Sequence, residues 1–197
     1  RFVIRSPDAE DASEKTVSWF QDPAYQRSFP GERHPTTVSE AEAYLTDQSR
    51  RSRRILVIES GSQLIGLIWV EFLTPRIAIT HHYIGERSWW GKGVIYEARA
   101  AVMNALFRLG AVKIVGKPNA DKRAVTQTYR DQGFTQEGIL RQERGNPDGT
   151  RSDVMYFGVL AQEWDYQKAR QIPEKIQRRL ARTGALTTGE DAEQVRD

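Results

Sequence analysis

Two glycines on either side of a lysine mark the stretch of the chain best suited to binding a charged group. Gly91, Lys92 and Gly93 stand between an apolar run that ends near Gly85 and a long helical pattern. Glycine tolerates backbone angles that let successive N–H groups point outward. The next helix adds unpaired N–H groups and the positive end of its dipole. The turn therefore predicts an anion site, most usefully a phosphate site, although an ordinary strand-to-helix turn would use the same residues.

Titratable side chains near the preceding strands could act as a general base or relay a proton. The candidates are Glu71, His81, His82 and Glu86. Glu71 lies in an otherwise apolar run, where burial would make it a better general base; the alternative is a strand end at which it pairs with an arginine. Either histidine could relay a proton near neutral pH, or could simply be packed in the sheet. With three histidines and no cysteine, we expect no metal site.

The elements that position these residues follow from hydrophobic periodicity. Residues 54–59 and 63–73 predict a hairpin, and the second strand has two apolar faces, so it is central and covered on both sides. Residues 76–85 predict the strand that leads into the glycine turn. The helix after the turn has one buried face and ends at Gly110. That face is expected to consist of Ile95, Ala98, Val102, Leu106 and Leu109.

The flanking segments complete the predicted sheet and its helices. A first strand at residues 2–5 precedes a helix from Asp8 to about residue 20, which Asp22-Pro23 ends, and residues 24–36 are irregular. A second helix runs to about Gln48 and begins at Ser39, Thr36 or Thr37. After a strand at 111–115, Asp121 caps a helix over 122–132, and 138–144 with 151–160 form a closing hairpin.

The C-terminal part of the chain changes in composition. Residues 165–183 predict a basic helix with Pro173 in its first turn and Gly184 after its end. Its apolar stripe (Ile172, Ile176 and Leu180) is too narrow for a free helix, so the helix docks on the domain or on a second subunit in a homodimer. Residues 185–197 are small, polar and acidic, and we expect a disordered tail.

Length and composition exclude several classes of protein. The 197 residues favour one domain, and the net charge of +3 does not require nucleic acid. Two arginine clusters, 50–54 and 178–182, are typical of solvated surface, or of contact with an acidic partner such as RNA or a ligand that carries phosphates. No stretch predicts a membrane span or a signal peptide, and the cytoplasm is the expected location.

The order of motifs after Tyr83 resembles the GNAT N-acetyltransferases. Gly-Lys-Gly, a helix and a strand are followed by Arg-Ala, Tyr-x-x-x-Gly-Phe, Glu-Gly-x-Leu-Arg, Asp and Glu-Trp. The likeness covers about residues 1–165, is most specific over 90–141, and is greatest to the branch with ribosomal-protein N-terminal and spermidine acetyltransferases (RimJ/RimL-like). It implies an α+β fold with a mixed, mostly antiparallel sheet flanked by helices. The implied divisions are an acyltransferase domain at 1–164, an extra C-terminal helix at 165–184 and the tail.

The resemblance also implies a cosubstrate and site residues. Acetyl-CoA would place its pyrophosphate on the turn formed by Trp90, Gly91, Lys92, Gly93 and Val94. Its pantetheine arm would enter between the strand that contains Ile84 and the strand ending near Gly116, beside Asn119 and Lys122. Tyr129, in the Tyr-x-x-x-Gly-Phe motif, would protonate the departing thiolate; without the motif it would be interpreted as a core aromatic residue.

Three departures from the family pattern leave details open. Ser88 stands where the family has Gln or Arg, Lys122 replaces an asparagine, and residues 115–117 carry no glutamate. The general base therefore remains open among Glu71, His82, the other titratable candidates and water. The loop at 24–36 would cover the acceptor, and residues that could line its pocket are Tyr25, Phe29, Glu32, Arg33 and His34.

The expected activity is transfer of an acetyl group from acetyl-CoA to a primary amine by direct attack. The acceptor would be a protein N-terminus or a small amine, and a cationic acceptor could be held by Glu32, Glu71 or Glu86. The alternative from another class is a non-catalytic acyl-CoA-binding or assembly module with the same fold. A third interpretation is a nucleotide-binding protein that uses the same phosphate turn.

Overall fold

The computed structural model of the protein describes residues 1–29, 34–47, 53–146 and 148–182. One seven-stranded sheet has the order β1-β2-β3-β4-β5-β7-β6. Its strands are β1 (Val3–Arg5), β2 (Arg53–Ser60), β3 (Gln63–Thr74), β4 (Ile77–Ile84), β5 (Lys113–Gly116), β6 (Thr135–Gly145) and β7 (Arg151–Leu160). The α-helices are α1 (Glu14–Gln21), α2 (Pro23–Ser28), α3 (Val38–Thr46), α4 (Val94–Arg108), α5 (Arg123–Asp131) and α6 (Tyr166–Arg182). The predicted α+β class, with a mostly antiparallel sheet, is confirmed.

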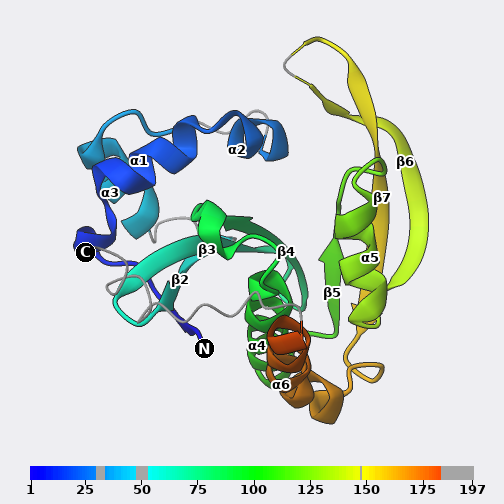
Figure 1. Ribbon diagram of the computed structural model, residues 1–197. Helices are drawn as coiled ribbons and strands as arrows, with labels where there is room; N and C mark the ends of the chain where they lie inside the picture. The colour runs from blue at the N-terminus through cyan, green and yellow to red at the C-terminus, as the bar shows by residue number, and fades with distance from the viewer. Residues whose placement is uncertain (30–33, 48–52, 147, 183–197) are drawn as a thin grey trace.

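Strands β4 and β5 form the parallel pair of the sheet and separate along their length. Their register runs from Ile77 opposite Lys113 to Ile79 opposite Val115, after which β5 ends at Gly116 while β4 continues. A parallel pair needs a crossover connection, and here α4 provides it. Figure 1 shows β1–β4 on one side and β5–β7 with α5 on the other. The separation opens at the ends of β4 and β5.

Each face of the sheet has its own hydrophobic core. Side chains alternate between faces along a strand, so in β3 Ile68 and Val70 pack toward α4 whereas Leu67 and Trp69 pack toward α1–α3. Helix α4 crosses the first face, and α1, α2 and α3 cover the second (Figure 1). The prediction that β3 is covered on both sides is confirmed.

The N-terminal helix predicted from Asp8 to about residue 20 is divided in two. A short 3-10 turn, η1 (Ala9–Asp11), is followed by α1, and each has its own capping box, at Asp8 and at Ser13. The second capping serine starts a new helix instead of continuing the first. Asp22-Pro23 ends α1 as predicted, but Asp22 also caps α2, in a region predicted to be irregular. Asp followed by Pro is an N-cap and N1 pair, so the dipeptide both stops one helix and begins another.

Several other boundaries also differ from the prediction. Thr37 is the N-cap of α3, so of the three alternatives Ser39 and Thr36 are wrong, and the predicted end at Gln48 lies outside the described residues. Lys122, not Asp121, is the N-cap of α5. Gly110 (φ 95°) follows the end of α4 as predicted. Leu109 was expected on the buried face but is 84% exposed, because it lies beyond the last helical turn.

Helix α6 docks on α4 of the same chain. Ile176 and Leu180 are buried and Ile172 is partly buried against the core that contains α4. Trp164 packs beside Phe107, near the end of α4. Pro173 lies inside α6, so its predicted place in a first turn is wrong. Gly184 and the predicted tail lie outside the described residues. The apolar stripe therefore buries against its own domain, one of the two predicted alternatives.

Candidate active site

The glycine turn forms the N-terminal end of α4. Gly91 (φ 74°) and Gly93 (φ 77°) both have left-handed backbone angles, and Gly93 is the N-cap. Within the turn, the N–H of Trp90 donates to Arg87 (3.0 Å) and the N–H of Lys92 donates to Trp89 (3.3 Å). Two of the five predicted phosphate donors are thus already engaged. Among the backbone hydrogen bonds of the described residues, the N–H groups of Gly91, Gly93 and Val94 have no carbonyl partner.

The side chains around the turn hold it against neighbouring elements. The Trp90 indole Nε1 donates to the Ile84 carbonyl at 2.8 Å, which ties the turn to the end of β4. The Lys92 ammonium lies 5.4 Å from the centroid of Trp89. A Cβ on Gly93 would come 2.6 Å from Cγ2 of Ile176 in α6. The turn is therefore held between the end of β4 and the docked C-terminal helix.

An acidic residue in the first turn of α4 is neutralised. The buried Glu97 carboxylate forms an ion pair with Nη2 of Arg1, and the same nitrogen donates to the Lys92 carbonyl at 2.8 Å. A bare carboxylate here would repel an incoming anion. The pairing with Arg1 removes that obstacle.

Tyr129 occupies a tightly defined position beside the separating strands. It lies on α5, is 5% exposed, and stacks on Phe157 with centroids 5.3 Å apart and planes 8° apart. A Cβ on Gly116, the last residue of β5, would come 2.0 Å from the ring atom Cε1. Phe134 meets the ring edge-on at 5.0 Å. The glycine at the end of β5 and the aromatic neighbours together fix the phenol ring.

Beneath Tyr129 lies a buried arginine that the sequence analysis did not select. The guanidinium carbon of Arg99, in α4, is 4.0 Å from the Tyr129 ring centroid, and the side chain is 2% exposed. Its Nη2 is 3.4 Å from the Thr128 hydroxyl, while Nε and Nη1 have no hydrogen-bond partner. Burial lowers the pKa of Arg99. A signal was present, because Arg99 is four residues after Ile95 and three before Val102, on the apolar stripe itself.

His82 lies on the same face of the sheet as Arg99. It is buried, and its Nε2 has no partner. Burial lowers its pKa well below 6.5, and the positive charges of Arg99 and His81 act in the same direction. The neutral imidazole is therefore the stable form, which makes His82 a poor acceptor for an amine proton.

The segment after β5 is held by a second arginine that the sequence analysis missed. Arg144 in β6 donates to the Asn119 side chain at 2.6 Å and to the Lys117 carbonyl at 2.9 Å. Burial lowers the pKa of Arg144, and Tyr129 acts on it in the opposite direction. Lys122 is exposed at the start of α5, with its ammonium 4.0 Å from Asp121. Asn119 is thus fixed in place, whereas Lys122 extends toward solvent.

The other face of β3 and β4 carries Glu71 and His81. The Glu71 carboxylate lies 4.0 Å from Nε of Arg53 and 3.9 Å from Nε2 of His81. The Glu71 side chain is 37% exposed, so the expectation of a buried carboxylate is wrong and the alternative, a strand end beside an arginine, holds. Glu86 lies elsewhere, with its carboxylate 3.0 Å from Lys15.

Aromatic side chains surround Glu71 and His81 on that face. Phe29 lies 4.7 Å from Trp69 and 6.0 Å from His81, between ring centroids. The Tyr44 hydroxyl accepts from Arg53 (2.6 Å) and from the Trp69 indole (3.2 Å). We call these six residues the aromatic acceptor face: Phe29, Tyr44, Arg53, Trp69, Glu71 and His81. It combines flat apolar surfaces with one carboxylate.

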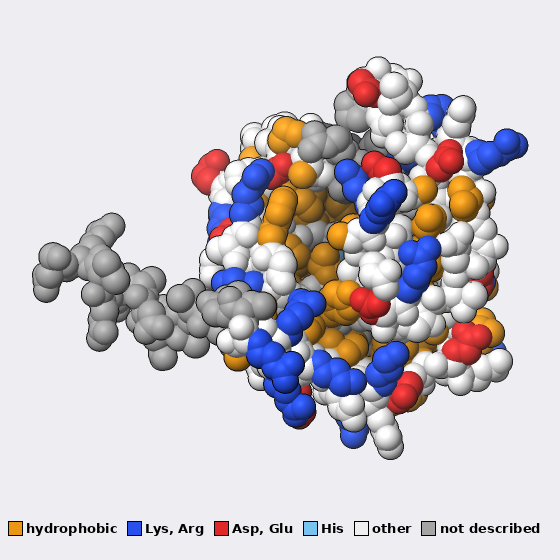
Figure 2. Space-filling view, turned by 45° about the vertical axis from the view of Figure 1, so that its right-hand side comes forward, with side chains coloured by type: hydrophobic (Ala, Val, Ile, Leu, Met, Phe, Trp, Pro, Cys, Tyr) orange, Lys and Arg blue, Asp and Glu red, His pale blue; other side chains and the backbone are white. Residues whose placement is uncertain are grey.

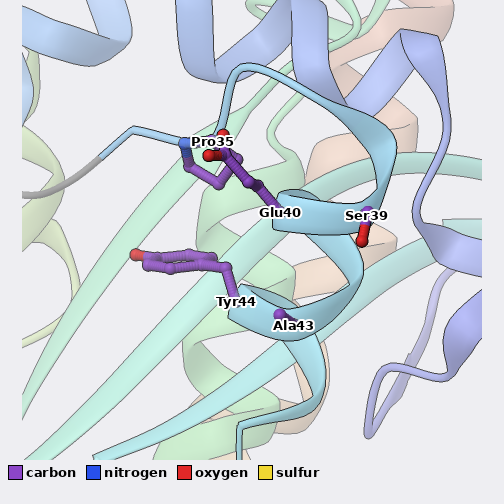
Figure 3. Close-up of a pocket in the computed structure, with 5 residues that line it drawn as sticks. All are labelled: Pro35, Ser39, Glu40, Ala43 and Tyr44. Atoms are coloured by element: carbon purple, nitrogen blue, oxygen red, sulfur yellow. The ribbon is translucent and has the colours of Figure 1, made fainter.

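Helix α3 borders this face with a pocket of about 360 Å³. Figure 3 shows its lining residues, Pro35, Ser39, Glu40, Ala43 and Tyr44, with Glu40 directed toward Pro35. The Glu40 carboxylate accepts from the backbone and the hydroxyl of Thr36, both at 2.8 Å, so it fixes the start of α3.

The residues that were predicted to line an acceptor pocket lie in different places. Phe29 is on the aromatic acceptor face, Tyr25 is core at 1% exposure, His34 packs on Tyr25, and Glu32 and Arg33 lie outside the described residues.

The predicted site residues thus form two groups on opposite faces of the sheet. Tyr129 and His82 share the α4 face through Arg99, and Glu71 with His81 belongs to the other. The molecular surface turned toward the viewer in Figure 2 is hollowed, with apolar side chains on the floor. Lys and Arg side chains gather below the hollow, at the height where Figure 1 places α4 and α6.

In the described residues no helix is long and apolar enough to cross a membrane, and no cluster of His, Cys, Asp and Glu side chains could hold a metal.

Comparison with known proteins identifies the family and the fold. A family model described as an acetyltransferase (GNAT) domain matches residues 1–135. No curated protein sequence matches significantly. Among solved structures, the spermidine N-acetyltransferase from Vibrio cholerae in complex with CoA and spermine has a TM-score of 0.72 at 20% identity, over 82% of this chain and 96% of that one.

Two further structures have the same fold. The RimL ribosomal L7/L12 α-N-protein acetyltransferase in complex with coenzyme A has a TM-score of 0.71 at 19% identity, over 81% of this chain and 93% of that one. A putative acetyltransferase from T. thermophilus has a TM-score of 0.69 at 20% identity, over 91% and 93%. The fold and the family model define an acyltransferase architecture. The chain belongs to the GNAT acetyltransferase family, as the motif order indicated.

Proposed function

We propose that the protein is an N-acetyltransferase that transfers an acetyl group from acetyl-CoA to a primary amine. The observation that carries this proposal is the placement of Tyr129. Its ring is fixed against Gly116 at the end of β5, where β5 separates from β4. A phenol at that point can donate one proton to a thiolate without a metal. The family membership of the chain supports the same reaction.

The residues of the glycine turn fit the cosubstrate. Three backbone N–H groups without carbonyl partners, at Gly91, Gly93 and Val94, lie at the positive end of the α4 dipole. They would hold the pyrophosphate of acetyl-CoA. The pantetheine arm would then lie between the ends of β4 and β5, near Ile84 and Asn119. Two of the structural neighbours, the spermidine enzyme and RimL, were solved with coenzyme A, which supports this choice.

Each residue of the proposed site has one task. The turn binds and orients the cosubstrate, and Tyr129 protonates the sulfur when the carbon–sulfur bond breaks. Glu71, at the aromatic acceptor face, would take through water the proton that the amine must lose, because it lies on the other face of the sheet from Tyr129. His82 was another of the predicted bases; its burial beside Arg99 stabilises the neutral form, so Glu71 is a better candidate than His82.

The aromatic acceptor face suits an amine that arrives as an ammonium ion. Aromatic faces attract cations, and the partly exposed Phe29 ring, which packs on the fully buried Trp69, provides one on this face. The Glu71 carboxylate adds a negative charge on the same face. Among amines, we propose a protein N-terminus or a small polyamine. The two named neighbours act on one of each kind: spermidine and ribosomal protein L7/L12.

Calorimetry and a transfer assay together test the proposal. Acetyl-CoA should bind saturably to the wild type and fail to bind to Gly93→Glu, which adds bulk and negative charge at the turn. With an amine panel of N-terminal peptides and polyamines, coenzyme A should be released, and Tyr129→Phe should slow this about 100-fold or more. Binding without release by any amine would favour the non-catalytic module. No binding by the wild type would refute the proposed function.

A further inference from the structure

Arg99 is a buried cation without an anion. Across the described residues no carboxylate forms an ion pair with it, and the titratable groups acting on its charge are the phenols of Tyr129 and Tyr96. Two of its three guanidinium nitrogens have no hydrogen-bond partner, and the third has one long contact of 3.4 Å. A buried charge that is left unpaired destabilises a fold. Its presence here is therefore not explained by stability.

The neighbours of Arg99 point to Tyr129 as the group it serves. The guanidinium carbon lies 4.0 Å from the ring centroid, the geometry of a cation over an aromatic face. Arg144 also acts on Tyr129, but two of its nitrogens are held by Asn119 and by the Lys117 carbonyl. His82, which faces Arg99, is neutral and cannot compensate its charge. The charge of Arg99 is therefore uncompensated and lies directly against the phenol.

We propose that Arg99 is a positioning residue that promotes proton donation by Tyr129, holding the ring and stabilising the negative charge that forms on it. The inference rests on the proposed function. An ordinary phenol is a weaker acid than an ordinary thiol, so passing its proton to a thiolate is uphill without help. A desolvated positive charge against the ring makes that transfer less unfavourable, because low-dielectric surroundings strengthen the attraction.

The proton and electron balance of the step is complete. A bond forms between the amine nitrogen and the acetyl carbon, and the carbon–sulfur bond breaks with its electron pair on sulfur. The Tyr129 hydroxyl gives its proton to sulfur. The acceptor, which arrives as an ammonium ion, loses one proton before attack and a second once the carbon–nitrogen bond has formed, and the base passes both to solvent. Tyr129 then regains a proton from solvent. The products are the acetamide and free coenzyme A, and Arg99 keeps its charge throughout.

Arg99→Met is the variant that tests the role, because methionine is long, unbranched and neutral. Its matched control is Arg108→Met, which removes an exposed arginine from the same helix. Arg99→Lys keeps the charge and should retain more activity than Arg99→Met. In the absence of substrate, the melting temperature of Arg99→Met should equal or exceed that of the wild type, since an unpaired buried charge is removed. A fall of many degrees would show a structural role and overturn the proposal.

The leaving group supplies a readout that a structural role would not change. We would compare acetyl-CoA with its selenoester analogue, whose selenol is more acidic and leaves with less help from a proton donor. Arg99→Met should lower kcat about ten- to hundredfold with the thioester and much less with the selenoester, as Tyr129→Phe should. Arg108→Met should behave as the wild type. Equal losses with both donors would refute the role of Arg99, whereas failure of the wild type with every amine would refute the proposed function itself.

Discussion

The ring of Tyr129 lies against the backbone of Gly116 so closely that any side chain at that position would displace it. A Cβ built on Gly116 would be 2.0 Å from Cε1 and 2.5 Å from Cζ. Real Cβ contacts are never this short, so the ring or the end of β5 must move. Because the other neighbours of the ring, Phe157 and Phe134, are packed against it, little room is left for that movement.

Gly116→Ala should therefore impair chemistry through Tyr129. We expect kcat to fall about 100-fold, the size of effect produced by a catalytic group misplaced by about 1 Å. The matched control is Gly138→Ala in β6, where a Cβ would meet nothing within 4 Å. Steady-state rates of coenzyme A release would be measured for both. Equal activity of the two variants would show that the Tyr129 position is unimportant.

The contact between Gly93 and Ile176 allows a second test, of how α6 is attached. Gly91 and Gly93 have nearly the same positive φ, so alanine at either position costs about 1 kcal/mol of backbone strain. Only at Gly93 would the new Cβ also meet Ile176, at 2.6 Å. Gly93→Ala should thus lower the melting temperature more than Gly91→Ala does. Adding Ile176→Ala to Gly93→Ala should recover part of the difference, and no recovery would argue against the α6 contact.

His82 should make the protein less stable in acid. The pKa of His82 in the folded state lies well below 6.5, so only the unfolded state takes up a proton as the pH falls through 6.5. The free energy of unfolding then decreases, by at most about 1.4 kcal/mol per pH unit for one proton. Above pH 6.5 both states are neutral and the contribution is constant.

Denaturant titrations between about pH 7.5 and 4.5 would measure this slope for wild type and His82→Gln. The variant should have the shallower dependence, whatever its stability at neutral pH. Parallel slopes for the wild type and His82→Gln would contradict the burial of a neutral imidazole.

How far the sequence predicts this protein depends on how local each signal is. The strands, the helix after Gly93 and its end at Gly110 follow from periodicity and glycine, which are local, and they were predicted correctly. The two faces of β3 follow as well, from alternation along one strand. Asp22 was interpreted only as a stop, because its second role as the cap of α2 depends on the residues after Pro23.

The site was predicted less completely because it depends on contacts between distant segments. Tyr129 could be selected from its motif, but its fit to Gly116 joins residues 13 positions apart that meet only after β5 and α5 fold. For Glu71 two alternatives stayed open, burial in an apolar strand or a strand end beside an arginine, because the sequence does not show where the strand leaves the core. The structure places Glu71 near the end of β3 beside Arg53, where the strand has begun to leave the core. Arg99 was overlooked although its place on the apolar stripe was a signal, because the ring that it packs against, Tyr129, belongs to a distant segment.

The Tyr44 hydroxyl gives the last prediction, which concerns the aromatic acceptor face. It accepts from Nη2 of Arg53 at 2.6 Å and from the Trp69 indole at 3.2 Å, and so fixes both side chains that flank Glu71. Tyr44→Phe removes the acceptor, and a buried donor without a partner costs about 1–3 kcal/mol. Arg53 and Trp69 would then lose their alignment with Glu71. The KM for the amine should rise severalfold, while the KM for acetyl-CoA should stay within twofold, because the glycine turn is built from other elements.

Initial-rate measurements with each substrate varied in turn would separate the effects of Tyr44→Phe on the two KM values. The control is Tyr166→Phe, on α6 and away from this face. A change confined to the acetyl-CoA KM would mean that this face does not hold the acceptor.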